Sequence, residues 1–301
     1  MKVHLVDGTY ELVRQHFGQA VRSSDPAPWA ATTGVLNSTL QLLSDGATHI
    51  GVASDHAIES FRNELWHGYK TSAGMDPVVK DQIPVMERAL AALGVTVWPM
   101  VEFEADDALA SAAAVADAHG DVEQVVILTA DKDLGQCVRG GRVVQVDRRK
   151  PRPGAAVNES GVIDEQGVIA KFGVPPSSIA DYLGLVGDSS DGFPGVSGWG
   201  AKSAAAVLAR YGSIENIPLL VEDWDVPGLR GAARLCDNLN AERELALLFR
   251  QLATVVTTVP VGRVEEWHWT GPTSDFAAVC AELGSPRRAE RASAHARGRV
   301  R

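Results

Sequence analysis

Short apolar runs alternate with segments of helical spacing through the first half of the chain. The apolar runs are Val3–Val6, His49–Ser54, Val95–Pro99, Val125–Ala130 and Gly141–Val146. The segments with helical spacing are Thr33–Leu43, Asp81–Leu93 and Glu104–Ala118. Strands that alternate with helices predict an α/β fold, in which a parallel sheet carries helices on both faces. In such folds the ligand site lies outside the carboxyl ends of the strands.

Acidic residues are concentrated where these runs end. The nine that follow an apolar run or stand in a tight acidic group are Asp7, Asp55, Glu104, Asp106, Asp107, Asp131, Asp133, Asp188 and Asp191. The strand ends and one helix start predict that the first seven meet at one rim of the sheet. Carboxylates are the ligands that Mg²⁺ and Mn²⁺ prefer, and two such ions about 4 Å apart catalyse phosphoryl displacement. The pattern therefore predicts a metal site that acts on phosphate.

Each acidic group also has an ordinary explanation when it is taken alone. EADD at 104–107 is typical of a helix start, where acids oppose the helix dipole. TADKDL at 129–134 and GDSSD at 187–191 are typical of polar turns. Three acidic groups together with two aspartates at strand ends favour the metal site over these separate explanations.

The composition is that of a globular protein. The 301 residues, 45% of them hydrophobic, suffice for one large domain or for an α/β domain with a smaller helical companion. The three cysteines lie far apart, so we expect free thiols in a reducing compartment. The histidines lack the spacing of paired metal ligands. With no signal-peptide h-region and no run of about 18 apolar residues, we expect a cytoplasmic, soluble protein.

The charge is unevenly distributed along the chain. The net charge is −10, yet Ser285–Arg301 contains six arginines and one glutamate. We expect this tail to be disordered. If metal ions neutralise the nine carboxylates, the rest of the surface is only mildly acidic, and basic positions can dominate local contacts. The acidic net charge therefore does not exclude a nucleic-acid partner.

The second half of the chain is mainly helical. Its helix candidates are Ser177–Val186, Ala201–Tyr211 and Ala232–Leu252, the last with an interruption. A polar segment rich in Pro and Gly at Arg148–Gly161 indicates a boundary or an exposed connection. A coil-rich region is expected after Pro260.

Two basic residues stand in FRNELWHGYK, Phe61–Lys70, shortly after Asp55. On a helix Arg62 and Lys70 would lie on neighbouring faces and could both point at a phosphate, although an ordinary solvated surface is the more common explanation for such a pair. Arg14 has the same two interpretations. The aromatics Trp66 and Tyr69 either stack on bases or, more commonly for isolated aromatics, fill a core.

A glycine-rich turn, PGVSGWGAKSA, leads into the helix candidate at 201–211. Backbone N–H groups at such a helix start bind anions. The candidate residues for DNA contact are Gly195, Gly198, Gly200, Lys202 and Ser203. The alternative is a turn between packed helices. The nucleotide-loop spacing GxxxxGK[ST] is absent, so a helix-hairpin-helix clamp on a nucleic-acid backbone fits better.

Taken in order, these motifs resemble the bacterial 5′-nuclease family. That family includes flap endonucleases, 5′–3′ exonucleases and the N-terminal domain of bacterial DNA polymerase I. The resemblance runs from Val3 to about Val259. It is carried by DG at 7–8, D-x₆-FR at 55–62, YK at 69–70, EADD at 104–107, T-x-DKDL at 129–134, LVGDSSD at 185–191 and the turn PGVSGWGAKSAA.

The resemblance implies a domain plan. A PIN-like nuclease core would occupy residues 1–165, with a helical arch at about 60–85. A helix–three-turn–helix DNA-binding region would occupy 166–259, and a C-terminal extension 260–301. Relatives often carry an arginine at the position of Ala73 and an isoleucine at that of Trp199, and Gly192 replaces a common asparagine. None of these changes removes a proposed ligand.

The resemblance also implies residue roles. The nine acids would hold two divalent ions, Mg²⁺ or Mn²⁺. Arg62 and Lys70 would contact the scissile phosphate from the base of the arch. Arg14 and the 195–203 turn would contact the DNA backbone, and carbonyls around Val196 and Trp199 would bind potassium.

The implied reaction is hydrolysis of a DNA phosphodiester near a 5′ end or flap junction, leaving a 5′-phosphate. The substrate would be DNA with a 5′ flap, a nick or a 5′ single-stranded end, in replication or repair. We expect a monomer that acts without a membrane, and a stand-alone nuclease, because no polymerase sequence follows. Two alternatives are a noncatalytic DNA-junction binder and a related single-strand ribonuclease. The full acidic set disfavours the first, and the duplex clamp disfavours the second.

Overall fold

The computed structural model describes residues 1–21, 27–148 and 161–299. The chain packs into two compact units. Unit 1 comprises Met1–Ile58, Ser72–Thr129 and Val256–Arg301, and unit 2 comprises Glu59–Thr71 and Ala130–Val255. Most of the segment at 148–161 that we predict to be a boundary lies outside the described residues. The chain-ordered domain limits at 165 and 259 stay a prediction.

Unit 1 is built on parallel strands in the order β3-β2-β1-β4. Their bounds are β1 Lys2–Asp7, β2 His49–Asp55, β3 Thr96–Met100 and β4 Gln124–Leu128. In β1 and β2 the central side chains are buried, as expected for strands covered on both faces. The predicted strands are present, with ends shifted by one or two residues.

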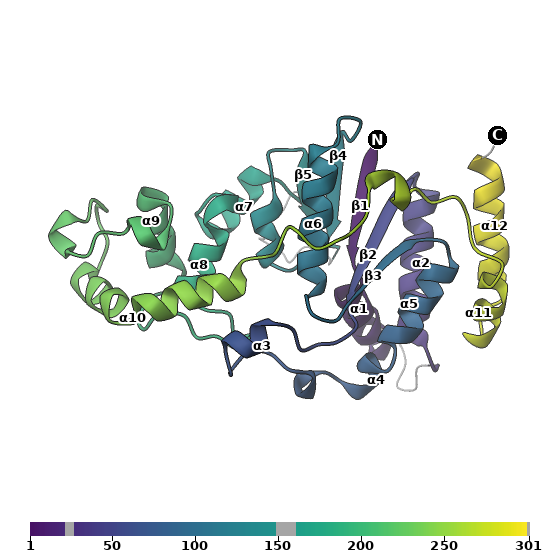
Figure 1. Cartoon of the computed structure of the whole chain (residues 1–301), viewed down its shortest axis with the longest axis horizontal. Helices are drawn as coiled ribbons and strands as arrows, with labels where there is room; N and C mark the ends of the chain where they lie inside the picture. The colour runs from purple at the N-terminus through teal and green to yellow at the C-terminus, as the bar shows by residue number, and fades with distance from the viewer. Residues whose placement is uncertain (22–26, 149–160, 300–301) are drawn as a thin grey trace. The chain divides into compact units, whose positions relative to one another are not determined.

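Helices cover both faces of this sheet (Figure 1). The helix α6 lies on one side, and α1, α2 and α5 lie on the other. The bounds are α1 Gly8–Ala20, α2 Ala30–Ser44, α4 Pro77–Lys80, α5 Ile83–Ala92, α6 Ala105–Ala118, α11 Phe276–Glu282 and α12 Arg287–Arg299. The short 3₁₀ helices are η1 Ser72–Gly74 and η6 Val264–Trp267. The alanine-rich sequence of α6 permits this close packing on the sheet, because small side chains let a helix approach the strands.

Unit 2 is mainly helical. Its α-helices are α3 Arg62–Leu65, α7 Glu165–Phe172, α8 Ile179–Val186, α9 Ala201–Tyr211 and α10 Ala232–Ala253. The strands β5 Val143–Val146 and β6 Val162–Ile163 pair antiparallel. The 3₁₀ helices are η2 Asp133–Cys137, η3 Pro176–Ser178, η4 Ile214–Asn216 and η5 Val221–Asp223. The expected interruption of the long helix occurs at Glu242, whose backbone is non-helical.

Aromatic contacts hold the core of unit 2. Phe249 of α10 stacks on Phe193 at 5.6 Å between ring centroids and meets Trp66 edge to face at 5.1 Å. Tyr69 is 3% exposed in the same core. Trp66 and Tyr69 therefore follow the core interpretation rather than base stacking. Their burial connects the segment after α3 to the helices α8 and α10.

The segment Phe61–Lys70 is helical only in part, because α3 ends at Leu65 and Trp66 is extended. One prediction about regular structure is wrong. The Arg-rich tail is not disordered within the described residues: it forms α12, with Ala292 fully buried. Alanines at helical spacing give that segment a face that packs, which its arginine content obscures. Residues 300–301 lie outside the description.

In the described part of the chain, no helix combines the length and apolar character needed to cross a membrane.

Candidate metal centre

The aspartates at the ends of β1 and β2 are fixed by neighbouring backbone and hydroxyl groups. Asp7 is 6% exposed and caps α1, because Tyr10 N donates to its Oδ1 at 2.8 Å. The Thr129 hydroxyl donates to the other oxygen at 2.8 Å. In parallel register Asp7 lies beside Ala53, so the strand-end position places it near Asp55 on the next strand. These contacts orient Asp7 without any cation.

Asp55 is connected in the same way to the start of α6. Ala105 N donates to Asp55 Oδ1 at 2.8 Å, and the backbone N–H of Asp55 donates to the Thr9 hydroxyl at 2.8 Å. Glu104, the residue before α6, is 3% exposed. Unit 1 thus brings Asp55 and the EADD motif together, as the strand-end argument predicts.

Asp107 differs from the other acids of unit 1. It is fully buried, and both of its oxygens accept backbone N–H groups, from Glu104 at 3.0 Å and from Val256 at 2.8 Å. Asp106 precedes it, half-buried in the first turn of α6. Hydrogen bonds to a buried carboxylate are strong and satisfy donors that would otherwise be orphaned. This geometry favours a structural role for Asp107 over the predicted role of metal ligand.

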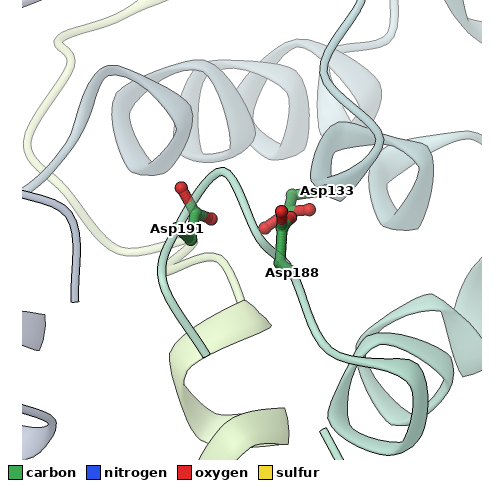
Figure 2. A group of neighbouring side chains, drawn as sticks. All are labelled: Asp133, Asp188 and Asp191. Atoms are coloured by element: carbon green, nitrogen blue, oxygen red, sulfur yellow. The ribbon is translucent and has the colours of Figure 1, made fainter. Parts of the chain in front are cut away.

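In unit 2, three aspartates converge with few neutral donors. Figure 2 shows Asp133 at the start of η2 beside Asp188 and Asp191 on the loop after α8. One carboxylate oxygen from each lies within 4.8 Å of the others. The side chains of Asp188 and Asp191 are only 3% and 13% exposed. Asp131 stands beside them, and its Oδ1 accepts the Asp133 N–H at 3.0 Å.

Burial, with repulsion between the acids adding to it, raises the pKa of two members of this Asp133/188/191 group. Burial, and then the charge on Asp131, raise the pKa of Asp133 well above its usual value. Burial raises the pKa of Asp191 to about 6, although Lys70 opposes the shift. The group therefore holds its negative charge at a cost that a divalent cation would remove.

Two lysines partly neutralise the group. Lys70 Nζ lies 3.0 Å from Asp191 Oδ1, and Lys132 Nζ lies 2.6 Å from Asp188 Oδ2. Burial alone would lower the pKa of Lys132, but the hydrogen bond and charge of Asp188 outweigh it and raise that pKa. Both lysines remain about one-third exposed, so they can exchange their carboxylate for another anion.

One oxygen of the group marks where a cation fits. Asp133 Oδ1 is buried and has no hydrogen-bond partner among the described residues. A buried carboxylate oxygen without a donor is costly unless a cation meets it. The donor set consists of carboxylate oxygens, which suits a hard divalent ion such as Mg²⁺ or Mn²⁺ rather than a thiolate-seeking metal.

Arg62 does not reach a surface where it could contact phosphate. Its side chain is buried, with the residue 2% exposed. Nε donates to the Leu252 carbonyl at 2.8 Å, and Nη2 donates to the Thr254 carbonyl at 3.0 Å. Arg62 thus satisfies carbonyls left open at the end of α10. The predicted phosphate contact does not fit this geometry, whereas Lys70 keeps an exposed ammonium.

Arg14 is also engaged within its own unit. Its guanidinium forms a 2.6 Å ion pair with Glu11, which is fully buried and also accepts from the Ser38 hydroxyl at 3.1 Å. The arginine compensates a buried charge that would otherwise be unfavourable. Its contact with DNA stays a prediction.

The glycine-rich turn has the conformation that its sequence requires. Gly195 and Gly198 have positive φ angles of 71° and 76°. A Cβ on Gly195 would collide with the backbone of Gly187, so no other residue fits there. Gly200 precedes α9 as its N-cap, and the Ser203 hydroxyl accepts the Gly200 N–H at 3.1 Å. Lys202 is exposed in the first turn.

The two candidate potassium carbonyls lie in the same turn. Val196 is buried, and its carbonyl accepts the Trp199 N–H at 3.1 Å. The Trp199 indole is buried and donates to the Leu235 carbonyl at 3.1 Å. The indole therefore fixes the turn on α10, and potassium binding stays a prediction.

Sequence reasoning missed some residues that shape these groups. Lys132 stands inside the DKDL motif and is recognisable only as part of it. Glu87 of α5 accepts the Ser54 hydroxyl at 2.7 Å and lies 2.7 Å from His56 Nδ1. His56 directly follows Asp55, but its partner is 31 residues away, so local patterns gave no signal for this contact.

Comparison with known sequences identifies two domains in the chain. Residues 2–173 match the 5′-3′ exonuclease N-terminal resolvase-like domain, and residues 174–275 match the 5′-3′ exonuclease C-terminal SAM fold. A 5′-3′ exonuclease of Buchnera aphidicola subsp. Baizongia pistaciae is 32% identical over 260 residues, covering 85% of this chain and 82% of that protein. DNA polymerase I of Lactococcus lactis subsp. cremoris is 33% identical over 215 residues. That match covers 71% of this chain but only 23% of the polymerase.

Solved structures share the fold. The T5 5′-exonuclease with bound zinc superposes with a TM-score of 0.64 at 18% identity, covering 98% of both chains. The catalytic core of Rad2 in complex with a DNA substrate has a TM-score of 0.60 at 15% identity, covering 98% of this chain and 92% of that one. The family domains account for residues 2–275, and α12 lies beyond them. The chain is a member of the 5′–3′ exonuclease family.

Proposed function

We propose that this protein is a metal-dependent nuclease that hydrolyses DNA phosphodiester bonds near 5′ ends and flap junctions. The observation that carries the proposal is the Asp133/188/191 group, in which no described residue donates a hydrogen bond to the buried Asp133 Oδ1. The residues that would hold two divalent ions are Asp7, Asp55, Glu104, Asp106, Asp131, Asp133, Asp188 and Asp191. Asp107 is left out, because both of its oxygens accept backbone donors.

The bound ions would be Mg²⁺ or Mn²⁺, and they would activate water and stabilise charge on the attacked phosphate. The chain's own contribution is orientation. Backbone and hydroxyl donors fix Asp7 and Asp55, and the tight loop after α8 fixes Asp188 through the Ser190 N–H at 2.9 Å. Such preorganised ligands lose little freedom when a cation binds.

Lys70 is the residue we assign to the substrate phosphate. In the metal-free protein its ammonium is paired with Asp191. When cations neutralise Asp191, the Lys70 ammonium would exchange this carboxylate for another anion, and a phosphate oxygen is the natural one. The Lys70 side chain is about one-third exposed, which permits that change without unfolding the segment after α3.

The glycine-rich turn would hold the DNA backbone. Exposed N–H groups at the start of α9, together with Lys202, offer donors and positive charge to a phosphate. The carbonyls around Val196 and Trp199 would bind a potassium ion. DNA replication or repair is the setting in which such a 5′-directed activity is used.

The test is cleavage of a labelled 5′-flap duplex with Mg²⁺ or Mn²⁺, compared with chelator. We expect incision near the junction, products with a 5′-phosphate and no cleavage in chelator. Asp131→Ala should abolish cleavage while DNA binding persists. Binding without cleavage in either metal would instead support a noncatalytic junction binder, and cleavage of single-stranded RNA alone would support a ribonuclease.

A further inference from the structure

The helix α12 is a strongly basic element of an acidic protein. It contains five arginines and one glutamate over Arg287–Arg299, whereas the whole chain has a net charge of −10. Arg287, Arg291 and Arg297 are exposed. Both family domains end before this helix.

Specific contacts hold α12 on α2 within unit 1 (Figure 1). Ala292 is fully buried, and His295 Nε2 lies 2.7 Å from the Ser44 hydroxyl. Arg288 Nε donates to Asn37 Oδ1 at 2.8 Å. The remaining arginines therefore project from a docked helix with defined spacing, which is the arrangement of a surface that binds rather than of a flexible tail.

Two neighbouring cavities lie at the start of this helix. One, of about 410 Å³, is lined by Asn37, Arg287, Arg288 and Arg291 together with Gly284 and Ser285. The other, of about 520 Å³, includes Trp29 and the same Gly284 and Ser285. Because Gly284 and Ser285 line both cavities, the two lie next to each other. An aromatic ring and three guanidinium groups thus border one surface track, defined here as Trp29, Arg287, Arg288 and Arg291.

Trp29 is held in an unusual conformation. It has a φ of 62°, and among non-glycine residues of the described chain it is alone in having a positive φ. Its ring remains 36% exposed. A left-handed backbone is unfavourable for a bulky residue and persists where the surrounding structure fixes it. In this conformation Trp29 lines the second cavity.

The chemistry of this track selects one class of ligand. Guanidinium groups bind phosphates in a bidentate manner, and an exposed indole stacks on bases of any sequence. The exposed face of α12 has no large apolar residue, so a membrane-inserting helix is not supported. Glu282, which also lines the second cavity, is paired with Arg88 at 2.5 Å and repels a phosphate less than a free carboxylate would.

We propose that the Trp29–arginine track binds single-stranded nucleic acid, with phosphates on Arg287, Arg288 and Arg291 and a base stacked on Trp29. The choice of DNA as ligand rests on the proposed function. The binding itself does not depend on metal ions or on cleavage.

Fluorescence anisotropy of a labelled oligothymidylate in chelator measures this binding without chemistry. The double variant Arg287→Ala/Arg291→Ala removes two phosphate contacts, so the slope of log affinity against log salt should decrease by about 1.4. The matched control Lys2→Ala/Arg263→Ala removes two exposed charges elsewhere in unit 1 and should leave the slope near the wild-type value. An equal decrease of the salt slope in both double variants would show that net charge alone causes the effect, and it would overturn the track.

Trp29 is tested by a pair of substitutions that share its backbone strain. Trp29→Phe keeps a ring and should retain most of the affinity, whereas Trp29→Leu should bind about tenfold more weakly. Equal affinities for the two variants would overturn the stacking role. Binding to anionic lipid vesicles with no binding to the oligonucleotide would overturn the ligand class.

The flap-cleavage assay separates this inference from the proposed function. If the wild-type protein never cuts a flap but the track variants lose oligonucleotide binding, the nuclease proposal fails and the track stands. If flaps are cut and the Arg287→Ala/Arg291→Ala variant binds the oligonucleotide with wild-type affinity and salt slope, the track fails and the nuclease proposal stands. The arginine variants alter exposed side chains, so their melting temperature should match that of the control.

Discussion

The negative charges of the acids in unit 1 and of those in unit 2 are stabilised by different kinds of partner. Asp7, Asp55 and Asp107 accept hydrogen bonds from backbone N–H groups or a hydroxyl. The Asp133/188/191 group relies mainly on two lysines, and one of its oxygens has no donor among the described residues. The first set is hydrogen-bonded without a cation, whereas in the second burial raises the pKa of Asp133 and of Asp191, and a cation would relieve these shifts. The difference teaches that a carboxylate's partners show how strongly its position depends on a cation, weakly in unit 1 and strongly in the Asp133/188/191 group.

The largest effect should come from Asp133, whose Oδ1 has no donor among the residues that the structure describes. Asp133→Asn keeps the size of the side chain but removes its charge, so we expect metal-dependent cleavage to fall about 10³-fold, equivalent to roughly 4 kcal/mol. Single-turnover cleavage of the flap substrate measures this loss. Asp107→Asn is the matched control in unit 1 and should lose much less activity per folded molecule. Equal losses would remove the distinction between the two regions.

For the free energy of unfolding, we expect substitution of Asp107 to cost more than substitution of Asp133. Asp107→Ala leaves two backbone donors without their acceptor, and we expect a loss of about 2–4 kcal/mol in the free energy of unfolding. Asp133→Asn relieves repulsion in the metal-free protein and should be neutral or stabilising. Chemical denaturation in chelator checks both values. A destabilised Asp133→Asn protein would show that the group is already balanced without a metal.

Within unit 2, substitution of Lys70 and substitution of Arg62 should have different effects. Lys70→Ala should slow cleavage about 30-fold, roughly 2 kcal/mol, with little change in melting temperature, because the side chain is partly exposed. Arg62→Ala should lower the melting temperature, because the Leu252 and Thr254 carbonyls lose their donors. Measuring the rate per folded molecule and the melting temperature for both variants tests this assignment. A stable but inactive Arg62→Ala protein would restore the phosphate role for Arg62.

The smallest effect is on pH dependence. The folded-state pKa of Asp191 is raised to about 6, so its ionisation opposes folding. The protonated Asp191 carboxyl therefore favours the folded state. Its contribution to the free energy of unfolding is fully present below about pH 4 and is lost as the pH rises through about 6. A cation must displace the proton, so Mn²⁺ affinity should increase up to tenfold per pH unit below 6 and level off above it. Calorimetric titration across this range checks the prediction, and a pH-independent affinity would contradict it.

The sequence predicts the strands and most helices of both units because their periodicity is local. Strand-end positions also predict that Asp7, Asp55 and Asp133 meet at one rim, whereas the acidic GDSSD turn predicts Asp188 and Asp191 as ligands. The roles of Asp107 and Arg62 could not be predicted, since they depend on contacts with Val256 and Leu252, far along the chain. For the same reason α12 was mistaken for a disordered tail: its arginines are conspicuous in the sequence, whereas the burial of Ala292 depends on tertiary packing.

Direct counting of bound Mn²⁺ tests the central claim that the Asp133/188/191 group is a cation site. Electron paramagnetic resonance gives the free Mn²⁺ during titration of the metal-free protein, in the absence of DNA. The account predicts saturable binding to the wild-type protein and the loss of one bound ion in Asp133→Asn, with Asp107→Asn retaining the wild-type number. An Asp133→Asn protein that binds as many ions, with the same affinity, would contradict it.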